Sequence, residues 1–407
     1  MEYAETGCVM PDNAEGKTSV KQYLSFSETK VALMSLAHGI NDMYAGFLST
    51  FIPFIRENLG LSYALAGSFN VIVGIFHIIC QPVIGFLSDR MRRPYLMIIG
   101  PILCGLGAVM IPNTNSYAAA LFFAGLWGFG SALFHPQGTG GVGYVSSPER
   151  LRFNMTWFSM SGVIGAAISP FVAVAIVSTL GYRWLPVALI PTLFLAPLIY
   201  FSMPFLKNET VSGDHPGGLL KTIWSLFALL YPIWGIAAIR DLLYQCIRFF
   251  LPMKIAAQGG ELVSVGAVVF LLTLGCSLGM IPMTKIAERY GSKRALKWSL
   301  FAGTCILLAA AYSGGLFSIA LYVAGLSCIY STISLTTTMA QILAPNDRST
   351  ASTIVLGLAW GVSNILVSPF GKLADLFGID AAFIILALMP LLGLLLFLTP
   401  PLKALKE

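Results

Sequence analysis

Runs of apolar residues, each long enough to cross a membrane, repeat along almost the whole chain with short polar breaks between them. A bilayer core about 30 Å thick takes roughly 20 apolar residues per helical crossing. The pattern predicts an all-α membrane protein with twelve transmembrane helices. We place these helices at Val31–Ile55, Ser62–Leu87, Pro94–Ile111, Tyr117–Tyr144, Phe153–Leu180, Trp184–Met203, Trp224–Met253, Leu262–Ala287, Leu296–Ser313, Leu316–Leu343, Ser352–Leu373 and Ala381–Leu398.

Composition and charge agree with a lipid environment and indicate how the chain is oriented. Only 10% of the residues are charged, against roughly 25% in an ordinary soluble domain. Lys and Arg accumulate in cytoplasmic loops, and most of the 24 in this chain fall on the side of the N-terminus. We therefore expect an inner-membrane protein with both termini in the cytoplasm. The net charge of +6 then reports topology, and no nucleic-acid partner is needed to explain it.

The second half of the sequence repeats the first. Asp42 and Pro53 in the first predicted helix correspond to Asp241 and Pro252 in the seventh, at a shift of about 199 positions. Because six crossings return the chain to its starting side, the two repeats are parallel and related by an axis along the membrane normal. We expect two six-helix bundles, at 30–203 and 222–399. A cytoplasmic linker at 204–221 joins them, and cytoplasmic tails lie at 1–29 and 400–407.

Two predicted helices carry ionisable side chains at mid-membrane depth, where an ionised group costs roughly 2.5 to 3.5 kcal/mol. The first helix places His38 and Asp42 one turn apart on the same face. The seventh repeats the device with Asp241 and adds Arg248 two turns later. Such polar stripes must face protein or a water-filled cavity, so we expect both helices to line a passage.

The turn after the second predicted helix carries a family motif. The run Gly85-Phe86-Leu87-Ser88-Asp89-Arg90-Met91-Arg92-Arg93-Pro94 resembles the G-x-x-x-D-R-x-G-R-K loop of the major facilitator superfamily, with Arg92 where glycine is usual. The counterpart after the eighth helix contains Glu288 and Arg289. The resemblance spans the whole chain. It implies the two-bundle major facilitator fold, in which the first, fourth, seventh and tenth helices line a central cavity.

The same loop supplies candidate gating residues. A carboxylate at the end of the second helix can accept hydrogen bonds from the N-terminus of the eleventh helix and hold the two halves closed. The alternative is a charged loop that only sets topology. The candidate gating residues are Asp89, Arg90 and Arg93, with Glu288 and Arg289 in the second copy.

Three stretches also resemble the fosmidomycin resistance protein group of that superfamily. They are His38-Gly39-Ile40-Asn41-Asp42, Gln81-Pro82-Val83-Ile84-Gly85 and Phe134-His135-Pro136. Members of that group often have glutamate after the His-Pro pair, where this chain has Gln137. The resemblance implies exchange of a drug for protons, but the missing carboxylate means that this activity is not carried over unchanged.

Candidate site residues follow from these polar stripes. Asp42, His38 and Asp241 are candidate proton-coupling residues, because a partly desolvated carboxylate and an imidazole exchange protons near neutral pH. Alternatively, they only tie helices together through buried hydrogen bonds. One or both of Arg240 and Arg248 bind an anionic group, or a salt bridge forms instead, either from Arg248 to Asp241 or from Arg240 to Asp42. The candidate substrate-binding residues are Asn41, His135, Gln137, Arg240, Tyr244, Gln245, Arg248, Ser334 and Thr338.

These features predict a secondary transporter that functions as a monomer and exports a small amphiphilic or anionic compound in exchange for protons. The alternative direction is proton-coupled uptake of an organic anion. A channel or solute receptor of the same fold is a further alternative, and a carrier is distinguished from a channel by saturation and counterflow. We expect no enzyme activity, cofactor or metal, because the cysteines stand singly, and the phosphate-loop-like run Gly16-Lys17-Thr18 has Pro11 where glycine is required.

Overall fold

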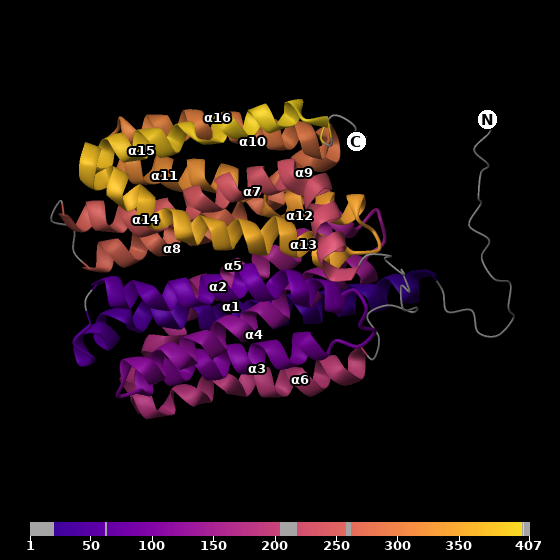
Figure 1. Cartoon of the computed structure of the whole chain (residues 1–407), viewed down its shortest axis with the longest axis horizontal. Coiled ribbons are helices and arrows are strands. Elements are labelled where there is room, and N and C mark those ends of the chain that lie inside the picture. Colours follow the sequence, from indigo (N-terminus) through magenta and orange to yellow (C-terminus); the bar gives the residue numbers. More distant parts are fainter. Residues whose placement is uncertain (1–19, 62, 204–217, 258–261, 401, 403–407) are drawn as a thin grey trace, which may run out of the picture.

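The computed structural model describes residues 20–61, 63–203, 218–257, 262–400 and 402, almost all of them helical (Figure 1). No strand occurs among these residues. The longer helices are α1 Val20–Asn58, α2 Tyr63–Ser88, α3 Tyr95–Met110, α4 Tyr117–Val145, α5 Leu151–Leu180, α6 Ile190–Ser202, α7 Gly218–Ala257, α8 Leu262–Leu278, α9 Met280–Tyr290, α10 Ser292–Ala311, α11 Gly315–Tyr330, α12 Ile333–Leu343, α14 Ala359–Phe377 and α15 Ile379–Leu388. The short ones are α13 Arg348–Thr353 and α16 Pro390–Leu395, with η1 Ile111–Asn113, η2 Tyr182–Leu189, η3 Ile354–Leu358 and η4 Leu396–Leu398.

The predicted class of a twelve-helix membrane protein is confirmed. In the described part of the chain, 11 helical segments are long and apolar enough to cross a membrane, and several combine two short helices, such as α11 with α12 at Gly315–Leu343. The remaining crossing is α1, which packs against α3, α4 and α5. It begins at Val20 rather than at the predicted Val31. Residues 20–29, which the sequence assigned to the N-terminal tail, are therefore helical.

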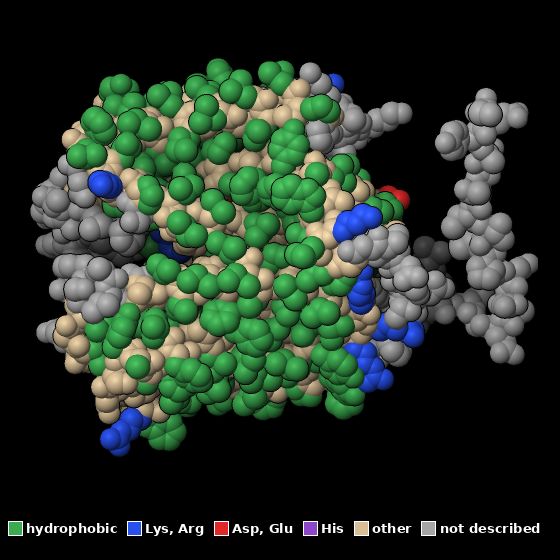
Figure 2. Space-filling view, viewed as in Figure 1, with side chains coloured by type: hydrophobic (Ala, Val, Ile, Leu, Met, Phe, Trp, Pro, Cys, Tyr) green, Lys and Arg blue, Asp and Glu red, His purple; other side chains and the backbone are tan. Residues whose placement is uncertain are grey.

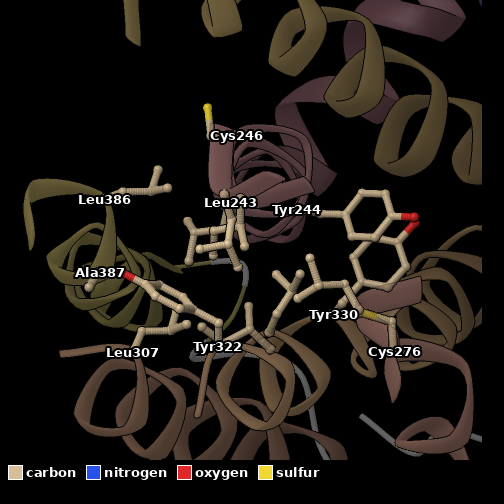
Figure 3. Close-up of a cluster of buried hydrophobic side chains, with 14 of the residues drawn as sticks. Leu243, Tyr244, Cys246, Cys276, Leu307, Tyr322, Tyr330, Leu386 and Ala387 are labelled. Carbon is tan, nitrogen blue, oxygen red and sulfur yellow. The ribbon is translucent and has the colours of Figure 1, made fainter. Parts of the chain in front are cut away.

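The helices form two bundles, each with its own apolar core. In Figure 1, α1 to α6 lie in the lower half and α7 to α16 in the upper half, and α1 begins at the same end of the molecule at which α16 finishes. Two buried clusters belong to the first half. The other two belong to the second, apart from Met160 of α5. Figure 3 shows part of one of them, around Leu243 and Tyr322. The predicted linker at 204–221 lies mostly outside the described residues.

The outer surface is apolar, as contact with lipid requires. Phe194 and Phe201 on α6 and Leu316 on α11 are among the exposed large hydrophobic side chains. Such side chains cover the long face of the molecule, while Lys and Arg side chains gather at the right-hand end (Figure 2). A soluble domain does not expose a continuous apolar surface of this size. This belt confirms a multi-pass membrane protein.

The bundles pack closely at one end, which we call the Asp89 end because α2 finishes there. Three glycines of the first bundle, Gly85, Gly140 and Gly143, lie against α12 and α13 of the second. A methyl group on any of them would meet atoms of the other bundle at less than van der Waals distance. The opposite end, where α5 finishes before Gly181, we call the Gly181 end.

Candidate functional site

Two imidazoles from two helices of the first bundle converge on one carboxylate. Nε2 of His38 lies 3.1 Å from Oδ2 of Asp42, and both residues are on α1. Nε2 of His135, on α4, lies 3.3 Å from Oδ1 of the same carboxylate. We call these three residues the Asp42 cluster. Asp42 keeps 22% of its side-chain surface exposed, so the cluster is reachable by water.

Hydrogen bonds to the backbone fix which nitrogen of each imidazole faces Asp42. Nδ1 of His38 lies 2.7 Å from the carbonyl oxygen of Phe158, and Nδ1 of His135 lies 2.9 Å from that of Ser131. A carbonyl oxygen only accepts, so each Nδ1 carries a hydrogen. Both Nε2 atoms therefore point at the carboxylate, and each of these contacts becomes a hydrogen bond only when a further proton lies between the nitrogen and the oxygen.

The fifth helix shapes the cluster, which the sequence did not indicate. The ring of Phe158 stacks on that of His38 with 4.2 Å between centroids. Gly162, one turn later, leaves the space that the cluster fills, because a Cβ there would lie 2.6 Å from both Asp42 Oδ2 and His38 Nε2. The only signal in the sequence was the recurrence of this glycine as Gly361 in the second half.

The ligand atoms of His38, Asp42 and His135 lie within 4.8 Å of one another, a spacing that a metal ion also accepts. Both nitrogen–oxygen pairs also stand at hydrogen-bonding distance, so the same geometry suits protons shared between the imidazoles and the carboxylate.

The corresponding carboxylate of the second bundle, Asp241, has an arginine partner instead of histidines. Arg240 and Asp241, adjacent on α7, form a two-pronged pair, with Nε to Oδ1 at 2.9 Å and Nη2 to Oδ2 at 3.1 Å. Arg240 also donates to Oγ1 of Thr336 on α12 at 2.8 Å, and it is fully buried. The two salt bridges expected from the sequence, Arg248 with Asp241 and Arg240 with Asp42, are wrong. Arg240 turns instead to its neighbour, because Thr336 satisfies its remaining edge.

Arg248 has no carboxylate partner among the described residues. Its guanidinium lies 5.7 Å from the centroid of the Tyr244 ring, and no ion pair of Arg248 occurs among the described residues. Tyr244 stacks on Tyr330 of α11 at 4.1 Å, and Figure 3 shows the two hydroxyl groups side by side. Gln245 donates to Oδ1 of Asn364 on α14 at 3.1 Å. α7 thus offers a positive charge beside an aromatic pair.

The remaining substrate-binding candidates separate into those near the Asp42 cluster and those away from it. Asn41 donates to Asp42 Oδ1 at 3.0 Å and belongs to the cluster's surroundings. Gln137 does not, because its amide accepts from Met97 N and donates to Arg93 O, bonds that hold the start of α3. Ser334 accepts from Thr156 of α5 at 3.2 Å. Thr338 has a buried hydroxyl without a hydrogen-bond partner in the described part of the chain.

Asp89 makes the contact that the loop motif predicted. Its carboxylate accepts from the backbone N–H groups of Ser349 and Thr350 at 2.8 and 2.9 Å, at the start of α13. Thr350 Oγ1 and Tyr144 Oη donate to it as well. Burial raises the pKa of the Asp89 carboxyl, and these four donors oppose that shift. α13 continues into α14, the eleventh crossing, so this acid joins the two bundles.

Among the contacts of the described residues, those of the other gating candidates stay within one bundle or lie on the surface. Arg90 donates to Phe86 O at 2.8 Å within its own bundle. Arg93 lies on the surface between the hydroxyl groups of Tyr95 and Tyr200, and these hydrogen bonds raise its pKa. In the second copy, Glu288 and Arg289 are exposed at the end of α9. The two copies of the loop motif are therefore unequal.

Comparisons with known proteins agree with this fold. A family model, the Major Facilitator Superfamily, matches residues 34–368 and 233–407. The uncharacterized MFS-type transporter YfnC of Bacillus subtilis is 23% identical over 386 residues, which are 92% of this chain and 93% of that protein. The fosmidomycin resistance protein of Escherichia coli is 23% identical over 379 residues, 90% of this chain and 91% of that protein.

Solved structures show the same architecture. The fucose:proton symporter FucP of E. coli superposes with a TM-score of 0.71 at 15% identity, over 91% of this chain and 98% of that one. A bacterial homologue of the iron transporter ferroportin, in an outward-facing state, gives a TM-score of 0.70 at 15% identity over the same shares of the two chains. The family model matches well over half of the chain, and the twelve-helix fold agrees with it, so this chain belongs to the Major Facilitator Superfamily.

Proposed function

We propose that this chain is a proton-coupled secondary transporter that works by alternating access and exports a small amphiphilic or anionic compound in exchange for protons. One observation carries the proposal. Two imidazoles, each with Nδ1 committed to a backbone carbonyl, aim Nε2 at the two oxygens of Asp42. Each contact requires its own proton, so the geometry suits a cluster that holds two.

Removing these protons changes the interaction between the two imidazoles and the Asp42 carboxylate from attractive to repulsive. With both present, two imidazolium rings flank one carboxylate, and the net charge of the three groups is positive. With neither, two nitrogen lone pairs face the oxygens of an anion, and among the described residues Asn41 Nδ2 is the donor that remains. A change of this size in a partly buried site favours different packing of α1 against α4, which is what coupling of protons to a conformational change requires.

Asp241 has a weaker claim to proton exchange, although its position in the repeat matches that of Asp42. Arg240 supplies a permanent positive charge on both oxygens of this carboxylate. We therefore assign coupling to the Asp42 cluster and treat the Arg240–Asp241 pair as a fixed, neutral element of α7.

The second bundle and the named relative support the proposed substrate class. Arg248 and the stacked Tyr244–Tyr330 pair suit a compound with an anionic group and an apolar or aromatic part. The relative named for fosmidomycin resistance supports export of a drug. Uptake of an organic anion with protons would use the same residues, and it remains the second candidate because the positive charge at Arg248 suits anions in either direction.

The gate and the orientation complete the proposal. Asp89 holds α13 of the other bundle, so loss of these bonds accompanies opening at the Asp89 end. Basic side chains gather at that end (Figure 2), and such residues favour the cytoplasm. We propose that the Asp89 end is cytoplasmic, that both termini lie there, and that one chain is the working unit in the inner membrane.

The experiment is a proton-flux assay in proteoliposomes that enclose a pH-sensitive dye, with EDTA present throughout. Fosmidomycin is the first probe, followed by a panel of phosphonates, carboxylates and hydrophobic drugs. We expect saturable proton movement with at least one compound, abolished by Asp42→Asn and reduced at least tenfold by His38→Gln or His135→Gln. The matched control is Ser327→Ala, since this hydroxyl only bonds back to Val323 O on its own helix.

Two results would contradict the proposal. Full-rate substrate movement without proton flux removes the coupling, and coupled flux that survives Asp42→Asn removes the cluster from it. Counterflow separates a carrier from a channel, and the sign of the internal pH change during substrate entry separates antiport from symport. Activity that EDTA eliminates would instead indicate that a metal ion occupies the cluster.

A further inference from the structure

A third histidine joins the two bundles through an aromatic contact. The ring of His77, on α2, lies 4.5 Å from that of Trp360, on α14, and the rings are tilted by 36°. His77 is buried, with 6% of its surface exposed. α2 belongs to the first bundle and α14 to the second, so this contact crosses the interface at which alternating access must separate the bundles.

On the first-bundle side, hydrogen bonds connect His77 to the Asp42 cluster. Nε2 of His77 lies 3.2 Å from Oγ of Ser131 on α4. The same hydroxyl lies 3.3 Å from Nδ1 of His135, whose Nε2 faces Asp42. Of the chain's four histidines, three therefore lie in one connected network, and the fourth, His215, falls outside the described residues.

On the second-bundle side, the connection continues to α7. Asn364, one turn after Trp360, donates to the Trp360 carbonyl at 2.9 Å. Its Oδ1 accepts from Gln245, which lies one turn before Arg248. The His77–Trp360 contact thus belongs to a series of contacts that begins at the Asp42 cluster and ends beside Arg248, the cation proposed to bind the substrate.

We propose that His77 and Trp360 form a joint through which proton loading of the Asp42 cluster changes the packing of one bundle on the other. This inference rests on the proposed function. When the cluster loses its protons, Asp42 no longer holds His135 Nε2, and that ring is free to turn about its Ser131 contacts. Ser131 Oγ is shared with His77, so the orientation of the His77 ring against Trp360 changes with it.

The charges that act on His77 support this direction of coupling. Titratable groups act on it from two neighbouring helices, His135 on α4 and Asp42 on α1. From the other bundle, α14 presents the uncharged Trp360 and Asn364. A change in the charge of the Asp42 cluster therefore alters the electrostatic environment of His77. The second bundle contacts His77 through uncharged groups, so it responds to the position of the His77 ring. In this proposal His77 acts as a positioning residue.

The test measures how the conformational equilibrium depends on pH, without any substrate. Genetically encoded spin labels replace the exposed Arg92 and Arg294, on opposite bundles at the Asp89 end, and leave the native cysteines in place. Pulsed electron paramagnetic resonance gives the ratio of separated to closed bundles from pH 5 to pH 9. A difference of one bound proton between the two states changes this ratio about tenfold per pH unit.

We expect the wild-type ratio to change about tenfold per pH unit over part of this range. In His77→Phe, which keeps a ring for Trp360 but loses the bond to Ser131, the change should fall to about threefold or less. Trp360→Leu should act similarly, whereas Trp360→Phe should restore most of the response because it keeps an aromatic partner. Ser327→Ala should resemble the wild type.

The outcomes separate this inference from the function on which it rests. If the wild-type protein responds to pH and His77→Phe responds equally, the joint is wrong while proton coupling stands. If the wild-type protein shows no response between pH 5 and pH 9, the proton coupling itself is wrong. A uniform shift of the ratio in His77→Phe at every pH, with an unchanged slope, would show ordinary loss of packing and also overturn the joint.

Discussion

Closure at the Asp89 end depends on a glycine of α4, and one methyl group there should hold this end open. Gly140 lies against Ser349 at the start of α13, and a Cβ at this position would come within 2.8 Å of Ser349 Cα. That atom belongs to the backbone of the other bundle, so it cannot move aside as the tip of a side chain can. Gly140→Ala therefore opposes the closed packing and leaves the separated state untouched.

The expected size of this effect follows from the cost of overpacking. An extra methylene in a close-packed interface costs about 1 to 3 kcal/mol. Since 1.4 kcal/mol is a factor of ten, the ratio of separated to closed bundles should rise roughly 5- to 150-fold. The intrinsic gain in helix propensity on replacing Gly by Ala applies in both states, so it cancels from this ratio.

The assay is the distance distribution between labels at Arg92 and Arg294, measured at one pH. The matched control is Gly74→Ala, because Gly74 also faces the other bundle but its Cβ would lie 3.9 Å from the Asn364 Cβ, an ordinary contact. We expect the control to keep the wild-type distribution. A Gly140→Ala protein that is folded and shows the same distribution as Gly74→Ala would refute the claim that α13 closes directly on α4.

Three further substitutions probe the rest of the site. Gly162→Ala places a methyl group 2.6 Å from Asp42 Oδ2 and should lower coupled proton flux at least tenfold with little change in thermal unfolding temperature. Asp89→Asn puts an amide N–H₂ against donors from α13, so the transport rate should fall more than the affinity for the compound found in the liposome screen. Arg240→Met leaves Asp241 as an unpaired buried charge and should destabilise the detergent-solubilised protein by about 3 to 5 kcal/mol, whereas adding Asp241→Leu should recover most of this loss.

The fold and the Asp89 contact were predictable because both depend on recognisable sequence features. Apolar runs of membrane length gave the crossings, and the repeat gave the parallel bundles. The Asp89 contact followed from a rule of helix ends, since unpaired N–H groups at the start of a helix attract a carboxylate. In the structure, Ser349 N and Thr350 N are the groups that Asp89 binds.

The partners of individual side chains were not predictable in this way. Adjacent residues on a helix do not face each other, so a bond from Arg240 to Asp241 is not expected from α7 alone. It forms because Thr336 of α12 takes the guanidinium's other edge. Gln137 similarly looked like a cavity residue, but the first turn of α3 has no side-chain cap of its own, and this amide supplies an acceptor to Met97 N.

The two halves neutralise their membrane carboxylates, Asp42 and Asp241, by different means, and we infer that the two carboxylates therefore have different roles. Each places a carboxylate at equivalent positions of the repeat, and each must neutralise it inside the membrane. The second half uses Arg240, which stays protonated, so the Asp241 pair keeps its charge state through the cycle. The first half uses His38 and His135, which carry a positive charge only when protonated. We infer that the duplicated fold contains one fixed site and one switchable site, and that the switchable one couples the proton gradient to movement of the bundles.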